Sequence, residues 1–244
     1  IFIFINVHAR LTIMNEECFR ISNVNSKSIC VETIDSTTLE IDNCRDSFIY
    51  VMKHFDSVII KHCSETTIFI SQASKVTLDR SDDMSFIGFC KSLCVSKSHD
   101  INLNLYVNSK PLISEGSFNV TIGPYNAVVS CTKPNGRNFW NHPTIETNAS
   151  FNLLEPDDFF PFVVPFYDNQ NEINAAIPMK YREALAKREK IAENRRKLVL
   201  EFCKANPEFA DKINEKISCK FNSYLEGSKC GKQINRSEEH TSEL

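Results

Sequence analysis

Glycine is scarce in this chain, with six residues among 244, and tryptophan occurs once. Antiparallel hairpins depend on tight turns rich in Asn-Gly or Asp-Gly, so this scarcity argues against a sheet built from hairpins. No run approaches the ~20 apolar residues that a membrane span needs. The formal net charge is −3, with basic and acidic residues interleaved, so wholesale nucleic-acid binding is not expected.

Two hydrophobic rows that recur about every 18 residues dominate what is present. Within each segment the apolar residues are two apart, which is the period of a strand with one buried face. The first row contains Leu39, Val58, Val76 and Leu93, followed two positions later by Ile41, Ile60, Leu78, Val95 and Ile113. The second contains Ile68, Phe86, Leu103 and Val120, followed by Ile70, Leu105 and Ile122, with Gly88 as the rung without a side chain. Segments of the two rows alternate, which predicts a solenoid with each strand stacked on its counterpart one turn later.

Residues 26–130 are therefore predicted to form a parallel β-helix, with a two-sheet sandwich as the alternative. The expected corners, such as residues 34–38 and 53–57, are rich in Asp, Ser, Thr and Lys. Such residues can cap a corner through hydrogen bonds from side chain to backbone, without a positive φ. Residues 1–25 are interpreted as a partial N-terminal segment whose beginning is missing.

Cysteine is plentiful, with ten residues, but no two of them form a C-x-x-C pair. Because no signal sequence is recognisable, we expect reduced and mostly buried thiols rather than a disulfide framework. Cys44 and Cys63 are 19 residues apart and should stack in neighbouring coils. Cys90 and Cys94 are four apart, a separation that zinc pairs seldom use, so neither a metal nor a cofactor is expected.

Beyond the solenoid, residues 131–177 hold most of the prolines and an aromatic run, so this segment is expected to be extended. It would pack on the flank or open end of the solenoid, with a partner-binding ribbon as the alternative. Residues 178–228 are predicted to be a helical extension. A first helix should begin near Pro178 and end before Asn206-Pro207, and a second should span residues 209–225, together forming a helical hairpin.

The first of these helices is strongly basic, with eight basic and three acidic residues between Lys180 and Lys197. Its basic face, which includes Arg188, Arg195 and Arg196, is either simply solvated or docks an acidic partner. Residues 229–244 are expected to be a disordered tail. Within it, residues 236–244 resemble the translation of a sequencing-library adapter and are left out of the fold prediction.

Three segments, residues 89–95, 109–113 and 120–125, resemble the tubulin-binding cofactor C homology (C-CAP) domain family. They read Phe-Cys-Lys-Ser-Leu-Cys-Val, Ser-Lys-Pro-Leu-Ile and Val-Thr-Ile-Gly-Pro-Tyr. The family has a Cys, a Gln-Leu-Arg-like triplet, a Pro-Ile-Ile-Glu segment and a Phe-Ala-Pro-Tyr-like closing strand at similar spacing. Residues 163–166 and 177–189 are similar to a member with a C-terminal helical extension. The resemblance implies a right-handed parallel β-helix, in agreement with the periodicity.

In catalytic members of this family, an outward arginine of the triplet acts as a finger on a bound GTPase. The resemblance places Cys94 at that position and Ser114 at the position of the family glutamate. An arginine finger contributes about 10³ to 10⁵ in rate, which a thiol cannot supply. Lys91 and Lys97 are near in sequence and remain candidate binding residues, but lysine lacks the planar fork of a guanidinium. We therefore expect no GTPase activation, no catalytic residue and no enzyme.

For function, the resemblance implies a non-catalytic scaffold of the cytoplasm and cytoskeleton, at the centrosome, spindle pole or basal body, that takes part in centrosome and Golgi positioning. Its partners would be proteins of the centrosome or microtubule cytoskeleton, with tubulin and small GTPases as candidates. The alternative is a GTPase-activating or tubulin-folding cofactor that acts on tubulin or an Arl-type GTPase through a substitute residue. A polysaccharide lyase or hydrolase is more remote, because the acidic cluster Asp79, Asp82 and Asp83 is expected at a turn rather than in a cleft.

Overall fold

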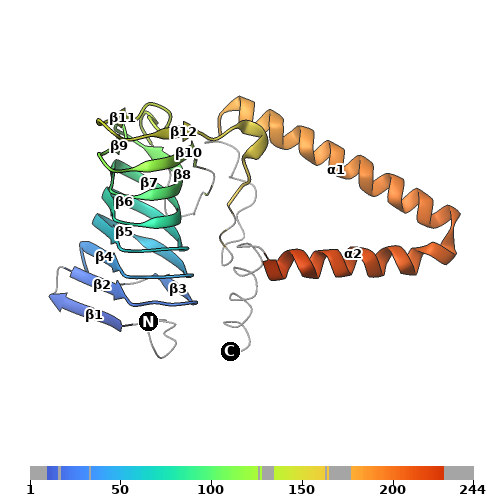
Figure 1. The fold of residues 1–244 in the computed structure, drawn as a ribbon, viewed down its shortest axis with the longest axis horizontal. Coiled ribbons are helices and arrows are strands. Elements are labelled where there is room, and N and C mark those ends of the chain that lie inside the picture. The colour runs from blue at the N-terminus through green and yellow to red at the C-terminus, as the bar shows by residue number, and fades with distance from the viewer. Residues whose placement is uncertain are drawn as a thin grey trace. The chain divides into compact units, whose positions relative to one another are not determined.

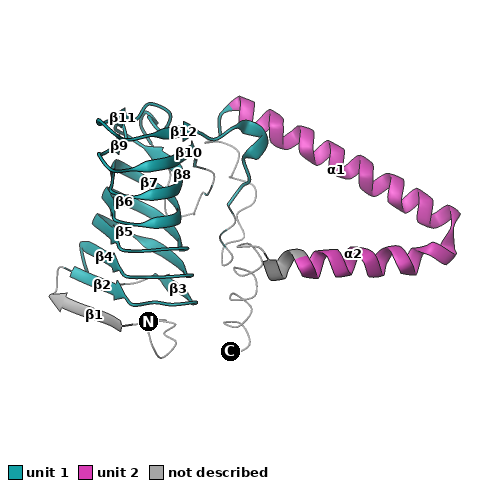
Figure 2. Ribbon diagram, in the orientation of Figure 1, with its two compact units in different colours: residues 1–178 teal, residues 179–244 magenta. Residues whose placement is uncertain are grey.

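The computed structural model of the 244-residue chain describes residues 10–15, 18–32, 34–125, 127, 135–162, 164 and 177–227. It divides into two compact units, residues 1–178 and residues 179–244 (Figure 2). The expected tail at residues 229–244, most of the aromatic segment after residue 162 and the first nine residues lie outside the described residues.

The first unit is a parallel β-solenoid, which confirms the predicted fold class over a sandwich (Figure 1). Its strands are β1 (Arg10–Asn15), β2 (Cys18–Ser22), β3 (Ser28–Val31), β4 (Thr38–Asp42), β5 (Phe48–Lys61), β6 (Thr67–Asp79), β7 (Asp82–Ser96), β8 (His99–Val107), β9 (Leu112–Ile113), β10 (Phe118–Pro124), β11 (Thr144–Ile145) and β12 (Phe151–Leu153). β1 pairs with β2 in the antiparallel sense, and the strand pairs described after it are parallel.

The solenoid has two flanks, because β5, β6 and β7 each contribute to both. The first flank consists of β2, β4, residues 57–61, 75–79 and 92–96 of the long strands, β9 and β11. The second consists of β3, residues 48–51, 67–70 and 85–88 of the same strands, β8, β10 and β12. The first hydrophobic row is in the predicted register, with Leu39 paired to Val58, Val58 to Val76 and Val76 to Leu93. These side chains are buried, so the stacked rows form the core.

The second hydrophobic row differs from the prediction at its last rung. Val120 pairs with Ile101 rather than with Leu103, whose partner is Ile122. A turn at residues 115–116 makes this coil two residues longer than the predicted alignment assumed. Because the shift is an even number of residues, the same side chains still point into the core.

The solenoid also extends beyond both expected boundaries, residues 26 and 130. β2 pairs in parallel with β4, while β11 and β12 add to β9 and β10. The segment after residue 130 therefore contains two further rungs rather than extended chain alone. These rungs are two and three residues long and lie among prolines, so no hydrophobic period marks them in the sequence.

One corner of the coil has a backbone conformation that the sequence analysis did not anticipate. Six successive coils each place two residues there with positive φ, three positions apart. The first column is Asn23, Asn43, His62, Arg80, Lys97 and Gly116, and the second is Ser26, Asp46, Glu65, Asp83, Asp100 and Asn119. The expectation that corners need no positive φ agrees with residues 34–38 and 53–57 but is wrong for this corner. Asn and Asp tolerate the left-handed region better than most residues, which helps a glycine-poor chain to turn here.

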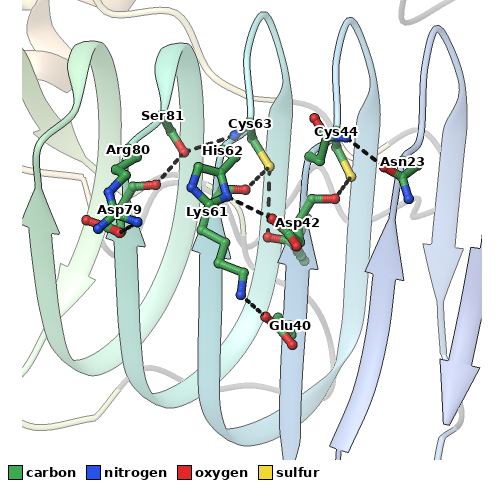
Figure 3. Close-up of polar contacts among 12 residues, drawn as sticks. Asn23, Glu40, Asp42, Cys44, Lys61, His62, Cys63, Asp79, Arg80 and Ser81 are labelled. Carbon is green, nitrogen blue, oxygen red and sulfur yellow. Dashed lines mark hydrogen bonds and ion pairs between the residues drawn. The ribbon is translucent and has the colours of Figure 1, made fainter. Parts of the chain in front are cut away.

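Between these two columns lies a buried ladder of small side chains. It consists of Val24, Cys44, Cys63, Ser81, Ser98 and Ser117. The Oγ of Ser81 donates to the carbonyl oxygen of Asp79 at 3.1 Å and accepts the backbone N–H of Cys63 at 3.2 Å (Figure 3). Ser98 repeats both bonds one coil later, while the thiols of Cys44 and Cys63 donate to carbonyls two residues back. The expected stacking of Cys44 on Cys63 is confirmed, and the eight described cysteines are free thiols.

The outer face of the second flank is covered by apolar chain. Tyr50, Phe69 and Ile87 point outward but are buried in a cluster that includes Tyr125, Ala127 and Val164. The ring of Phe162 stacks on that of Phe69 at 5.8 Å between centroids. The described end of the aromatic segment therefore packs on the solenoid flank.

The second unit consists of α1 (Met179–Ala205) and α2 (Pro207–Gly227), which are the two predicted helices. They are joined at Asn206, whose side-chain Nδ2 donates to the carbonyl of Phe202 at 3.0 Å. The rings of Phe202 and Phe209 meet at this junction, 6.2 Å apart. In the described chain, neither helix is both long enough and apolar enough to cross a bilayer.

Candidate functional site

The outer face of the first flank carries the positions that the resemblance singled out. In register along one row lie Arg20, Glu40, Ile59, Thr77, Cys94, Leu112 and Thr144. The neighbouring row contains Ser22, Asp42, Lys61, Asp79 and Ser96, and continues to Ser114 and Glu146. Because the solenoid repeats each rung at about 4.8 Å, residues far apart in sequence form continuous rows on this face.

Cys94 lies in β7, half-buried and directed outward between the inward residues Leu93 and Val95. Burial raises the pKa of its thiol above the ordinary value, and the negative charge of Glu146 adds to this effect. The positive charge of Lys75 acts in the opposite direction without reversing the shift. Near neutral pH this position therefore presents a protonated thiol, which is neither a cation nor a strong nucleophile.

A carboxylate lies beside Ser114, although it comes from a different coil. The Oγ of Ser114 donates to Oε2 of Glu146 at 2.6 Å, and the backbone N–H of Glu115 donates to the same oxygen at 3.1 Å. These two hydrogen bonds hold the pKa of Glu146 below its ordinary value, so the side chain is ionised at neutral pH. The face thus has a fixed anion where the sequence analysis expected none.

Glu146 was not among the predicted site residues, yet the sequence contains a local signal for it. Residues 143–146 read Pro-Thr-Ile-Glu and repeat the pattern of residues 111–114, which read Pro-Leu-Ile-Ser. The two tetrapeptides occupy the same position in successive coils, with Ile145 paired to Ile113. The later one carries the glutamate expected of a Pro-Ile-Ile-Glu motif, and it lay in a segment that was interpreted as extended chain.

Toward the N-terminal end, the same face carries a charge network centred on Glu40. Arg20 donates from Nε to Oε2 of Glu40 at 2.7 Å. Figure 3 shows the ion pair between Lys61 and Oε1 of Glu40. The side chain of Glu40 is 11% exposed. Burial alone would raise its pKa, but the hydrogen bonds from Lys61 and Arg20 outweigh it and hold the pKa below the ordinary value. Arg20 is the one arginine among the described parallel strands of this flank, and its guanidinium is ion-paired with Glu40.

The other predicted site residues lie in the solenoid outside the row of Cys94 and, in the second unit, on α1. Lys91 is exposed, and its backbone carbonyl accepts a hydrogen bond from the hydroxyl of Ser109 at 2.9 Å. Lys97 is an exposed corner residue with φ of 47°. On α1, Arg195 and Arg196 are exposed and Arg188 is half-buried. Their assignment as binding residues stays a prediction.

The family model for Tubulin binding cofactor C matches residues 36–144, from the start of the second parallel rung to the strand beside Glu146. This match confirms the resemblance to that family over residues 36–144.

Among curated proteins, the chain is similar to those named TBCC domain-containing protein 1. The bovine (Bos taurus) protein is 27% identical over 175 residues, which is 65% of this chain and 31% of that protein. The rat (Rattus norvegicus) protein is 26% identical over 79% of this chain and 36% of its own length. The zebrafish (Danio rerio) protein is 24% identical over 81% of this chain and 37% of its own length. The chain therefore spans about a third of the length of the relatives it matches.

Proposed function

We propose that this chain is the partner-binding part of a non-catalytic cofactor C-domain scaffold of the cytoskeleton, acting at the centrosome, spindle pole or basal body in the positioning of centrosome and Golgi. The observation that carries the non-catalytic part of the proposal is the chemistry of the first flank. At the arginine-finger position stands Cys94, a protonated thiol with Glu146 nearby. Neither group stabilises the negative charge that develops when a phosphoryl group leaves GTP.

The face has features suited to holding a partner without transforming it. Two hydrogen bonds hold the ionised side chain of Glu146 in place. It can therefore accept a hydrogen bond from a cationic group of a partner with little loss of side-chain entropy. The exposed arginines of α1 offer a separate cationic surface for an acidic partner. The proposed role at the centrosome rests on the family resemblance alone.

A second candidate function is GTPase activation with substitute residues, on tubulin or an Arl-type GTPase. Two observations favour it: Glu146 returns a carboxylate to the face beside Ser114, and the charge of Lys75 acts on Cys94. Lysine is, however, a point charge and cannot bridge two phosphate oxygens as a guanidinium does. We therefore place this candidate second.

A turnover assay separates the two functions. Purified chain is added to tubulin or to an Arl-type GTPase, with an arginine-containing cofactor C protein as the positive control, and GTP hydrolysis is measured. We expect no acceleration by the native chain or by Cys94→Arg, and a gain of about 10²-fold or more only when Cys94→Arg is combined with Ser114→Glu. Strong acceleration by the native chain that Lys75→Ala abolishes would establish the second function instead.

The cellular part of the proposal requires a separate experiment with the full-length protein. Proximity labelling in dividing cells is expected to recover neighbours from the centrosome or basal body. Recovery of tubulin dimers or small GTPases alone would contradict the scaffold and support the cofactor.

A further inference from the structure

A groove on the second flank, away from Cys94 and Glu146, has the chemistry of a cation-binding site. Its volume is about 340 Å³, within the range of ligand sites in proteins. The groove is lined by Ser85, Asn102, Leu103, Asn104, Thr121, Gly123, Leu154, Asp158 and Phe160. One wall is therefore the outer face of β7, β8 and β10, and the other is the chain that follows β12.

The second wall is held at both ends, so the groove is present before any ligand arrives. The backbone N–H of Leu154 donates to the carbonyl of Ile122 at 2.9 Å, which extends the last rung by one residue. Phe159 is fully buried and anchors the far end of the short 3₁₀ turn Pro156–Asp158. Gly123 allows the close approach, because a Cβ there would lie 2.8 Å from Cδ2 of Leu154. A preformed wall lowers the entropic cost of binding.

The one charged group of the groove is an acceptor, and its hydroxyl and amide side chains can accept as well as donate hydrogen bonds. Asp158 contributes a carboxylate that has no ion-pair partner among the described residues, and none of the lining residues is cationic. The Nδ2 of Asn104 already donates to the carbonyl of Pro124 at 3.3 Å, which leaves its Oδ1 to accept from a ligand. Phe160 is 73% exposed at the rim, where an aromatic face can attract a cation.

From this arrangement we infer that the groove binds the guanidinium of an arginine side chain presented by a partner protein. A guanidinium supplies several planar N–H donors for carboxylate and amide oxygens, and it stacks on aromatic rings. A single carboxylate does not provide the pair that glycoside hydrolysis uses, so the groove is a binding site and not a hydrolase cleft. The inference concerns a different flank from the proposed scaffold site and does not depend on it.

The test uses the full chain and two small probes, N-acetyl-arginine amide and its neutral counterpart N-acetyl-citrulline amide. Binding is followed by NMR through the side-chain amide signals of Asn102 and Asn104. We expect the arginine probe to shift these signals at millimolar concentration and the citrulline probe to bind about tenfold more weakly. Asp158→Asn should reduce arginine binding to the citrulline level, whereas Asp157→Asn, which removes the same charge from a residue outside the lining, should not.

A second variant keeps the test independent of one side chain. Gly123→Ala should weaken arginine binding, because the added methyl meets Leu154 and Asn104 across the groove. Backbone spectra of each variant establish that it is folded. Equal binding of both probes, equal shifts with a neutral sugar such as glucose, no shift at about 50 mM probe, or full binding by a folded Asp158→Asn variant would each overturn the inference.

Discussion

The hydroxyl of Ser114 donates a 2.6 Å hydrogen bond to the carboxylate of Glu146, a residue 32 positions later in the chain. The two residues lie on successive rungs of the first flank, since Ile113 pairs with Ile145. Sequence motifs alone assigned Ser114 to the position of the family glutamate. The next coil returns a carboxylate to the same part of the surface, and this anion acts on the neighbouring thiol of Cys94.

Glu146→Gln should make Cys94 more reactive. Burial would still raise the pKa of the thiol, but the contribution of the Glu146 charge would be removed, so the thiolate fraction at pH 8 should rise. Alkylation by iodoacetamide, followed by mass spectrometry of the peptide that contains Cys94, measures the rate. Glu115→Gln is the matched control, because the charge of Glu115 does not contribute to the shift. An unchanged rate in Glu146→Gln would show that the two groups are not electrostatically linked.

Ser81→Ala should destabilise the solenoid by about 1 to 3 kcal/mol, because the buried N–H of Cys63 loses its acceptor. Ser81→Cys is the control, since Cys44 and Cys63 occupy the same rung position in earlier coils and make the equivalent bond to a carbonyl. It should cost less than the alanine variant. Urea unfolding measures both changes, and equal losses would mean that the effect lies in packing and not in the hydrogen-bond ladder.

Glu40→Gln should lower the free energy of unfolding by about 1 to 2 kcal/mol at pH 7, since Arg20 and Lys61 would lose the charge that pairs with them. The pKa of Glu40 is held below its ordinary value in the folded chain. Its contribution is therefore fully present above the unfolded-state pKa, near 4.5, and is lost as the pH falls through the folded-state pKa.

The difference in unfolding free energy between native chain and Glu40→Gln should accordingly be smaller at pH 3 to 4 than at pH 7. The control is Glu65→Gln, which breaks the more exposed pair with Arg45. Its effect should stay below about 0.5 kcal/mol. A difference between native chain and Glu40→Gln that does not shrink with falling pH would contradict the electrostatic explanation.

Lys97→Gly should stabilise the chain by about 0.5 to 1 kcal/mol, because a left-handed backbone costs roughly 1 to 2 kcal/mol for most residues but not for glycine. Gly116 already occupies the same corner one coil later, with φ of 76°. Lys91→Gly, the same change at an exposed strand position, should destabilise by about 0.5 to 1 kcal/mol. Thermal unfolding of the two variants measures the difference, and shifts of the same sign would show that backbone strain at residue 97 is negligible.

Much of the fold was predictable because a solenoid repeats a simple local rule. The two-residue alternation within each strand and the regular repeat from coil to coil predicted that Leu39, Val58 and Val76 lie in one buried row. The helices were delimited by Pro178 and Pro207, since proline is tolerated in a first turn and disrupts a helix interior. These features depend on neighbours in sequence or on a regular repeat.

By itself, the sequence determined the stacked strands, their inward faces, the two helices and the outward direction of Cys94 between Leu93 and Val95. The tertiary structure alone decided that Val120 pairs with Ile101, that one corner requires paired left-handed residues, and that Glu146 lies against Ser114. The physical reason is that neighbours across coils depend on the exact length of every intervening turn. A two-residue turn or a three-residue rung changes that length, but it is too short to show a hydrophobic repeat in the sequence.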